Sequence, residues 1–327
     1  MKCQAIRVAE FGGPEQLVEM EYDVPSPSAG NVLVKVEAAG VNPVEIYIRQ
    51  GKYAKQPELP YTPGTEGAGT VAEVGKGVKG LKVGDRVFLT DTVSGHGTYA
   101  QYCLSPSNAV HLLPDNSSFE IGASIGIAYR TAWRALFLKS KMKKGDLVLV
   151  HGASGGVGMA SLQLGKDFGA RMVGTAGSPE GMEFIKSLGA EKAFDHTYKE
   201  YISELNEFSP NGYGLILTMR AHSNLGKDTV LVANGGKIVI VGAQGSSTIN
   251  PRRLMSKEAT IQGLMTWNFT ETETKQFVDF ISEKLKTEKI VPCVDEKYKL
   301  SDAKDAHQHI DRSVASKGKV LLVPWRS

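Results

Sequence analysis

Two different spacings of apolar residues divide the chain into regions. In the first third, every second residue from Val32 to Val36 is a valine, which is the period of a strand with one buried face. Short runs of β-forming residues follow at 70–74 and 86–89, and glycines separate them. Short strands at close spacing with glycine turns predict a barrel or a sandwich for this region.

The middle of the chain has a different pattern. Residues 147–150 read LVLV, a continuous apolar run that suits a parallel strand covered on both faces. Apolar residues then recur at three and four positions up to Phe168, so a helix is expected that ends at Gly169. A second helix should start at Ser178 with Pro179 in its first turn. Further strands are predicted at 171–175, 193–194, 215–217, 237–241 and 258–265.

Strands and helices alternate over this region, which predicts a doubly wound parallel sheet. The fold class is therefore α/β: a β-barrel domain at 1–120, a Rossmann domain at 121–265 and a C-terminal segment at 266–327. That segment should contain a helix around 277–285 and a last strand at 319–323 that returns to the first domain. The strand at 258–265 should form the outer edge of the sheet.

Composition removes several classes of function. The 327 residues carry a net charge of only +3, which gives no electrostatic reason to expect a nucleic-acid partner. Three cysteines lie far apart, so a disulfide framework is not expected and a reducing, cytoplasmic location is. The sequence has neither the apolar core of a signal peptide at its start nor a run long enough to span a membrane.

The stretch HGASGGVG at 151–158 is the first candidate binding motif. It lies between the LVLV strand and the following helix, where glycines let ligand oxygens reach backbone N–H groups and the helix dipole favours an anion. The spacing is G-x-x-G-x-x-G, and a glycine triplet by itself also suits a tight turn. Its position between a buried strand and a helix favours binding of a dinucleotide pyrophosphate.

The end of the second strand bears on which nucleotide is bound. NAD-binding sheets place an acid there for the ribose diol, but the stretch from Gly174 to Ser178 has none, and the next acid is Glu180. Ala176 occupies the position where such an acid would stand. This favours NADPH, with Ser178, the backbone of Gly177 and Lys192 as the available donors.

Several motifs together resemble one family. AAGVNPVEIYIRQGKY, LPYTPGTEGAG, GDRVF, HGASGGVG, GTAGSPEG and INPRRLMSKE occur in this order across nearly the whole chain. They resemble the zeta-crystallin type of NADPH:quinone oxidoreductase, a zinc-independent branch of the medium-chain dehydrogenase/reductase superfamily. The resemblance implies a GroES-like barrel, a Rossmann domain, a metal-free cleft between them, and one-electron reduction of ortho-quinones by NADPH.

The resemblance leaves other functions open. An enone or alkenal double-bond reductase that uses NADPH is the nearest enzymatic alternative. The family also includes lens proteins and RNA binders, so a structural or RNA-binding role with a retained cofactor site is a second class. Members are typically tetramers, and in the superfamily the outer strand of the sheet commonly pairs across a two-fold axis, so a homodimer or homotetramer is expected for this chain.

The residues themselves argue against zinc. Zinc-dependent relatives have metal-binding side chains where this chain has Asn42 and Thr65, and neither is a good zinc ligand. Glu66 remains, but one carboxylate does not hold zinc. Cys103 lies in an alternating segment and is expected to be a small hydrophobe on a strand. No metal site is predicted.

Catalytic and cofactor residues are assigned by matching the family's motifs. Asn42 and Tyr47 are the candidates to donate a hydrogen bond to a quinone oxygen. The other interpretation is that Asn42 and Pro43 cap the helix that contains Tyr47, and the two roles are compatible. His196 is either a cofactor contact or a surface histidine. Cofactor contacts are expected from Tyr47, Ser154, Gly155, Gly156, Val157, Gly177, Ser178, His196, Asn224, Val241, Gly242, Ala243, Gln244, Leu264, Met265 and Thr266.

Two departures from the family put the exact acceptor in doubt. Arg220 follows the fourth strand where relatives often have an acid, and the segment from Ser94 to Thr98 resembles an insertion. Both are expected to alter the shape or charge preference of the substrate site. His96 and His222 are expected to be solvated loop residues.

Overall fold

The computed structural model describes residues 2–90, 96–312 and 316–325. The chain forms two compact units. Unit 1 comprises Met1–Ile127, Thr274–Ser313 and Lys319–Ser327, and unit 2 comprises Ala128–Glu273 and Val314–Gly318. The chain therefore passes from one unit to the other after residues 127, 273, 313 and 318, whereas the sequence analysis placed the domain boundaries after 120 and 265.

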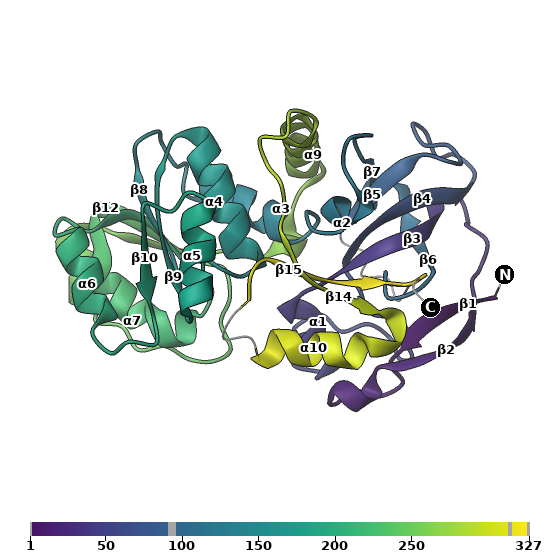
Figure 1. Ribbon diagram of the computed structural model, residues 1–327, viewed down its shortest axis with the longest axis horizontal. Coiled ribbons are helices and arrows are strands. Elements are labelled where there is room, and N and C mark those ends of the chain that lie inside the picture. The colour runs from purple at the N-terminus through teal and green to yellow at the C-terminus, as the bar shows by residue number, and fades with distance from the viewer. Residues whose placement is uncertain (1, 91–95, 313–315, 326–327) are drawn as a thin grey trace. The chain divides into compact units, whose positions relative to one another are not determined.

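Unit 2 contains a parallel sheet with the strand order β10-β9-β8-β11-β12-β13. Helices α4 and α5 lie on one side of it and α6 and α7 on the other (Figure 1). The doubly wound arrangement is confirmed, and β13 is the expected edge strand. Its strands are β8 (Leu147–Val150), β9 (Arg171–Ala176), β10 (Lys192–Asp195), β11 (Tyr213–Thr218), β12 (Val232–Ile240) and β13 (Thr260–Gly263).

The helices of unit 2 begin and end where local sequence signals predict. Gly169 ends α4 in the left-handed conformation with φ of 93°, and the side chain of Ser178 accepts a hydrogen bond at the start of α5. Glu258 corrects one prediction: it ends α8 instead of starting the outer strand. The helices are α3 (Ala128–Trp133), the π-helix η3 (Arg134–Lys139), α4 (Gly156–Phe168), α5 (Pro179–Ser187), α6 (Tyr201–Phe208), α7 (Ala221–Leu231), α8 (Pro251–Lys257) and η4 (Thr266–Asn268).

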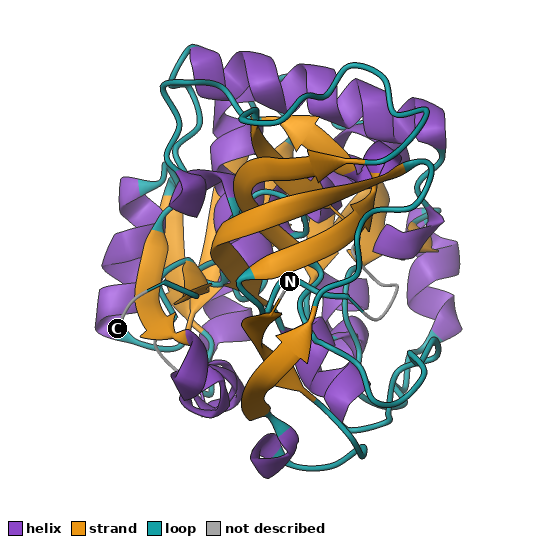
Figure 2. Cartoon of the chain, turned by 90° about the vertical axis from the view of Figure 1, so that its right-hand side faces the viewer, coloured by secondary structure: helices purple, strands orange, loops and turns teal. Residues whose placement is uncertain are grey.

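Unit 1 is built on a strongly bent sheet with the order β14-β15-β3-β4-β5-β7, and β6 also pairs with β3. Figure 2 shows its strands in orange, with the β1–β2 hairpin beside them. The last strand returns to this unit, as predicted, and lies between β14 and β3. The strands are β1 (Lys2–Arg7), β2 (Val18–Asp23), β3 (Asn31–Val41), β4 (Glu66–Val74), β5 (Arg86–Thr90), β6 (Tyr102–Pro106), β7 (Val110–Leu112), β14 (Val294–Lys299) and β15 (Lys319–Val323).

Helices cover the ends and sides of this barrel. Helix α1 follows directly on β3, and α10 packs against α1 and β15. Helix α9 contains the predicted helical segment at 277–285. The helices are η1 (Pro14–Gln16), α1 (Pro43–Arg49), η2 (Ser107–Ala109), α2 (Phe119–Gly122), α9 (Glu271–Lys286), η5 (Leu300–Asp302) and α10 (Ala303–Arg312).

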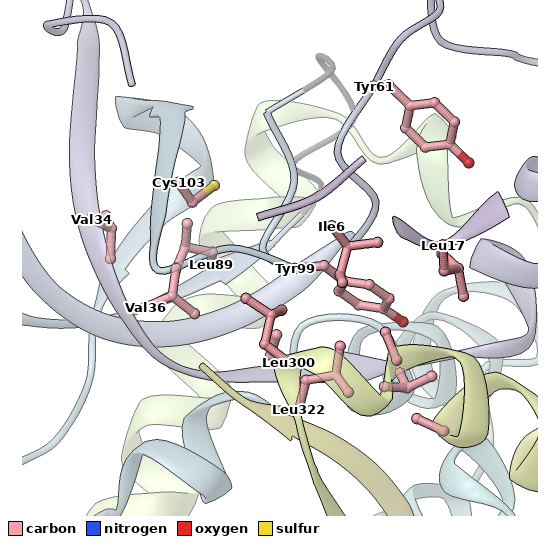
Figure 3. Packing of buried hydrophobic residues seen from close by; sticks show 14 of the residues in the cluster. Ile6, Leu17, Val34, Val36, Tyr61, Leu89, Tyr99, Cys103, Leu300 and Leu322 are labelled. Atoms are coloured by element: carbon pink, nitrogen blue, oxygen red, sulfur yellow. The ribbon is translucent and has the colours of Figure 1, made fainter. Parts of the chain in front are cut away.

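The core of unit 1 collects residues from distant parts of the sequence. Val34 and Val36 of β3 pack with Leu89 of β5 and Leu322 of β15 (Figure 3). The inward valines confirm the alternation predicted for the first third. Cys103 is fully buried in this cluster, as expected for a small hydrophobe. Among the described residues, no helix is long and apolar enough to cross a membrane.

Candidate functional site

The stretch at 151–158, named here the glycine turn, connects β8 to α4. Gly152 has φ of 62°, a left-handed conformation that favours glycine. A Cβ on Gly158 would lie 2.5 Å from the Cα of Ala153, so this glycine lets the first turn of α4 pack closely on the loop. These two glycines therefore have structural reasons to be glycine.

Gly155 has a different environment. It is the N-cap of α4, and the nearest atom to a Cβ added there would be the carbonyl oxygen of Gly152 at 3.7 Å. The space in front of it is therefore open. Gly156 and Val157, both half-buried, form the first turn of the helix, whose N–H groups have no partner within the helix. An open glycine surface at a helix N-terminus suits a phosphate group, so the turn fits a dinucleotide.

Polar side chains of neighbouring strands support the glycine turn. The hydroxyl of Thr175 on β9 accepts from the N–H of Gly152 at 3.1 Å and contacts Nδ1 of His196 at 3.2 Å. Nε2 of His151 contacts Oδ1 of Asp228 on α7 at 2.8 Å, and both side chains are buried. Sequence reasoning missed Thr175 and Asp228, because the spacing of the turn does not identify the residues that hold it.

The end of β9 corrects one detail of the nucleotide argument. The strand ends at Ala176 as predicted, but this side chain is fully buried. A carboxylate at 176 would enter the interior instead of reaching a ribose. Gly177 and Ser178 are half-buried, and the Ser178 oxygen accepts from the N–H of Gly181 at 3.0 Å, which leaves its hydroxyl hydrogen available to donate. His196 is exposed at the end of β10.

The remaining predicted cofactor residues follow the carboxyl ends of parallel strands. Asn224 lies on α7 after β11, the segment from Val241 to Gln244 follows β12, and that from Leu264 to Thr266 follows β13. Since these strands are parallel, all three segments lie at one edge of the sheet. A hollow of about 530 Å³ lies beside α7, lined by residues including His222, Ser223 and Lys227.

The two predicted catalytic residues belong to α1 in unit 1. Asn42 is the N-cap of this helix, and Tyr47 lies half-buried in it. The capping interpretation is therefore confirmed. The carboxylate of Glu45 accepts from the N–H of Asn42 at 2.7 Å. Asn42 is only 5% exposed, so its side chain is held inside the unit.

Asn42 belongs to a buried group of five residues, Asn42, Glu45, Thr65, Glu66 and Lys319, named here the buried polar cluster. Nζ of Lys319 lies 2.5 Å from Oδ1 of Asn42 and 2.5 Å from Oε1 of Glu66. Nδ2 of Asn42 donates to the same Glu66 oxygen at 2.9 Å. The other Glu66 oxygen accepts from the N–H of Ile127 at 2.7 Å. Both ends of the ion pair are buried.

Glu45 and Thr65 complete the buried polar cluster. Both the N–H, at 3.1 Å, and the hydroxyl of Thr65 donate to Oε1 of Glu45. Burial is the main reason that the pKa of Glu45 rises to about 7, while the Thr65 hydrogen bond and the charge of Lys319 oppose the rise. Sequence reasoning missed Glu45 and Lys319. A glutamate three residues after Asn42 is a capping-box signal, whereas Lys319 has no local signal of this kind.

The two departures from the family lie on different units. Arg220 is exposed at the start of α7 in unit 2. Within the Ser94–Thr98 segment, Ser94 and Gly95 lie outside the described residues. His96 of this segment is half-buried and its Nδ1 contacts the hydroxyl of Tyr22 at 2.9 Å. Nδ1 of His222 accepts from the N–H of Gln244. Neither histidine is a freely solvated loop residue.

Two sequence families match the chain. The alcohol dehydrogenase GroES-like domain matches residues 28–115, and the zinc-binding dehydrogenase family matches residues 156–283. The second description implies zinc, but the buried polar cluster does not fit it. An ammonium group already contacts Glu66 and Asn42, and Asn42 is one of the positions where zinc-dependent relatives have a metal-binding side chain; two cations there would repel each other. In the described part of the chain, no group of three or more His, Cys, Asp and Glu residues could hold a metal.

Named relatives match almost the whole chain. This chain is 43% identical to the rat quinone oxidoreductase, over 98% of this chain and 97% of the rat protein. It is 41% identical to the human quinone oxidoreductase, over 98% of this chain and 97% of the human protein. A solved mycobacterial structure, Rv1454c complexed with NADPH, has a TM-score of 0.90 at 30% identity and covers 98% of this chain and 100% of its own. The chain therefore belongs to the quinone oxidoreductase family of the medium-chain dehydrogenase/reductase superfamily.

Proposed function

We propose that this protein reduces quinones with NADPH, one electron at a time, with ortho-quinones as preferred acceptors. The observation that carries the proposal is the 43% identity with a quinone oxidoreductase over nearly the full length of both chains. The mycobacterial relative complexed with NADPH supports the cofactor. When bound, NADPH supplies two electrons and releases a proton, so that two quinones each receive one electron and become radical anions.

The glycine turn would bind the pyrophosphate. Gly155 leaves room for phosphate oxygens beside the first N–H groups of α4, and the helix dipole favours their charge. At the end of β9, Gly177 and Ser178 bring no negative side chain near an adenine ribose. The absence of an acid there supports NADPH over NADH, since a carboxylate would repel a 2′-phosphate.

Asn42 and Tyr47 would donate hydrogen bonds to the quinone that accepts the electrons. One hydrogen of the Asn42 amide is donated to Glu66, while the other faces Oε1 of Glu45 at 3.5 Å, which is a weak contact. This second N–H is the donor proposed for a quinone oxygen as negative charge develops on it. The Tyr47 hydroxyl is the second proposed donor, and it also serves as a cofactor contact.

The proposal includes a homodimer or homotetramer in the cytoplasm. The edge position of β13 supports the homo-oligomer, because among the described residues this strand has a neighbour on one side only, and such an edge is a natural pairing surface. Cys3 and Cys103, which are buried thiols without a disulfide in the described structure, support a reducing compartment. No observation favours RNA binding or a purely structural role.

The test is NADPH oxidation with 9,10-phenanthrenequinone, with an aliphatic enone, and with no acceptor. The quinone should accelerate NADPH loss, and 1,10-phenanthroline should leave the rate unchanged because no metal takes part. Two radical anions should form per NADPH consumed, as measured by electron paramagnetic resonance or by coupled cytochrome c reduction. Faster turnover of the enone, or chelator-sensitive activity with stoichiometric zinc, would overturn the proposal.

A further inference from the structure

The buried polar cluster contains an unusual component, a lysine at the start of a strand with a 2%-exposed side chain. Lys319 opens β15, and its backbone N–H donates to the carbonyl oxygen of Cys293. Its ammonium group contacts Oδ1 of Asn42, Oε1 of Glu66 and the carbonyl oxygen of Val41. Three acceptors therefore match the three N–H donors of a lysine.

The chemistry of an ammonium group fixes the orientation of the Asn42 amide. An asparagine side chain has an acceptor end and a donor end, which differ little in shape. Lys319 can only donate, so the oxygen end of the amide must contact it, and the Nδ2 end must contact other acceptors. Glu66, which accepts from Nδ2 at 2.9 Å, favours the same orientation. A flipped amide would place N–H groups against the cation.

We infer that Lys319 is a positioning residue for quinone reduction: its buried ammonium holds Oδ1 of the Asn42 amide and so keeps Nδ2 on the Glu66 and Glu45 side, where the weakly held N–H is the donor proposed for the quinone oxygen. The cation also draws electron density toward Oδ1, which makes the Nδ2 hydrogens better donors. This inference rests on the proposed role of Asn42, because Lys319 acts only through that side chain.

An alternative explanation is that Lys319 only neutralises the buried charge of Glu66. A double variant separates the two roles. Lys319→Met alone leaves a buried carboxylate without its cation, and we expect it to be unstable. Lys319→Met combined with Glu66→Gln removes both charges and should recover most of the lost stability. If Lys319 positions Asn42, kcat with the quinone should still fall by about tenfold to a hundredfold, because the amide is then free to flip.

The experiment measures urea unfolding, kcat and KM for 9,10-phenanthrenequinone, and NADPH affinity by fluorescence titration. Asn42→Ala is made alone and in the double-variant background. Because Lys319 acts through Asn42, the charge-free pair should add no further loss of kcat once Asn42 is absent. NADPH affinity should stay at the wild-type value throughout. Lys297→Met is the matched control, since Lys297 pairs with Glu120 at 3.0 Å on the neighbouring strand but is exposed.

The outcomes separate this inference from the proposed function. If Asn42→Ala lowers kcat but the folded double variant turns over like the wild type, Lys319 has only a charge-balancing role and the inference is wrong. If Asn42→Ala keeps the wild-type kcat, the proposed role of Asn42 fails and the inference fails with it. If no variant of this set, nor the wild type, oxidises NADPH with the quinone, the proposed function itself is wrong.

Discussion

The glycine turn and the buried polar cluster place polar groups in different ways. The glycine turn is one continuous stretch in unit 2, and it offers backbone N–H groups where side chains are missing. The buried polar cluster joins residues from α1, β4 and β15 of unit 1, and its polar groups are charged side chains that hold one another. A turn of the first kind is encoded locally, whereas the second kind depends on the completed fold.

The glycine turn and the buried polar cluster also differ in how strongly a substitution should change the free energy of unfolding. The glycines of the glycine turn carry no charged side chain, so a substitution at one of them acts mainly through the volume of the new side chain. In the buried polar cluster each charge compensates another, so the loss of one member leaves its partner uncompensated in the interior. The expected effects of substitutions should therefore be larger in the cluster than in the turn.

The largest effect is expected from Glu66→Gln. The ammonium of Lys319 would lose its only carboxylate contact in the described structure while staying buried. We expect a loss of about 3–5 kcal/mol in the free energy of unfolding, as for other broken buried pairs. Urea unfolding measures it. Glu73→Gln on the exposed side of the same strand is the control, and equal stability of both variants would contradict the view that this ion pair stabilises unit 1.

Next in size is the pH dependence caused by Glu45. Its pKa is about 7 in the folded protein and 4.5 ordinarily. Below about pH 4.5 both states hold the proton, and between that pH and about pH 7 only the unfolded state releases it. The stability of the wild type should therefore decrease across this window, by about 3 kcal/mol at 1.36 kcal/mol per pKa unit.

Glu45→Gln provides the reference for this prediction, since an amide does not titrate. Urea unfolding at several pH values from 4.5 to 8 should show the wild type losing stability relative to this variant as the pH rises. If the two proteins change in parallel, Glu45 is ionised in the folded protein throughout and the interpretation of the cluster is wrong.

In the glycine turn, Gly158→Ala should have a smaller effect, about 1–3 kcal/mol. The new Cβ would lie within 2.5 Å of the backbone of Ala153, and such overpacking forces the helix away from the loop. Gly155→Ala is the matched control, since its Cβ would meet open space. Its unfolding free energy should change by less than about 1 kcal/mol, while NADPH affinity falls.

These paired variants sharpen the comparison within one loop. Thermal unfolding reports packing, and a cofactor titration reports binding. If Gly155→Ala destabilised the protein as much as Gly158→Ala, or bound NADPH as tightly as the wild type, the space beside Gly155 would not be the phosphate site.

The smallest effect concerns cofactor choice at the end of β9. Because Ala176 is buried, the informative substitution is Gly177→Asp at the next position. Its charge would repel a 2′-phosphate but accept from a ribose hydroxyl, so kcat/KM for NADPH relative to NADH should fall about tenfold, equal to about 1.4 kcal/mol. The change should appear mainly in KM.

The measurement is a titration of both cofactors at saturating quinone. Asn211→Asp, an exposed change of the same charge before β11, should leave the ratio unaltered. An unchanged ratio in Gly177→Asp, or a wild-type preference for NADH, would contradict the assignment of this strand end to the phosphate.

The two sites also differ in how far the sequence predicts them. Gly169, Ser178 and the glycine turn follow local rules of capping and spacing, and the structure places helices α4 and α5 as these rules predict. Lys319 could not be found this way. It lies 253 positions from Glu66, and a single lysine before an apolar run reads as a surface residue until β15 is known to pair with β3.

The burial of individual side chains is the second property that the sequence pattern does not predict. Ala176 was expected at the cofactor edge, where an acid would reach a ribose, yet its side chain is fully buried, because a parallel sheet of this kind is covered on both faces. His96 was expected in solvent, yet it contacts Tyr22. Both depend on the packing of neighbouring elements, which the local sequence does not specify.

The discontinuous make-up of unit 1 has a consequence for synthesis on the ribosome. Most of unit 2 is one continuous stretch, Ala128–Glu273, and it is fully translated before the later segments of unit 1 exist. The sheet of unit 1 stays incomplete until β15 emerges, since this strand lies between β3 and β14. Until then Glu66 has no ammonium partner. The nascent chain should therefore form most of unit 2 first, and complete the sheet of unit 1 only after β15 has left the ribosome.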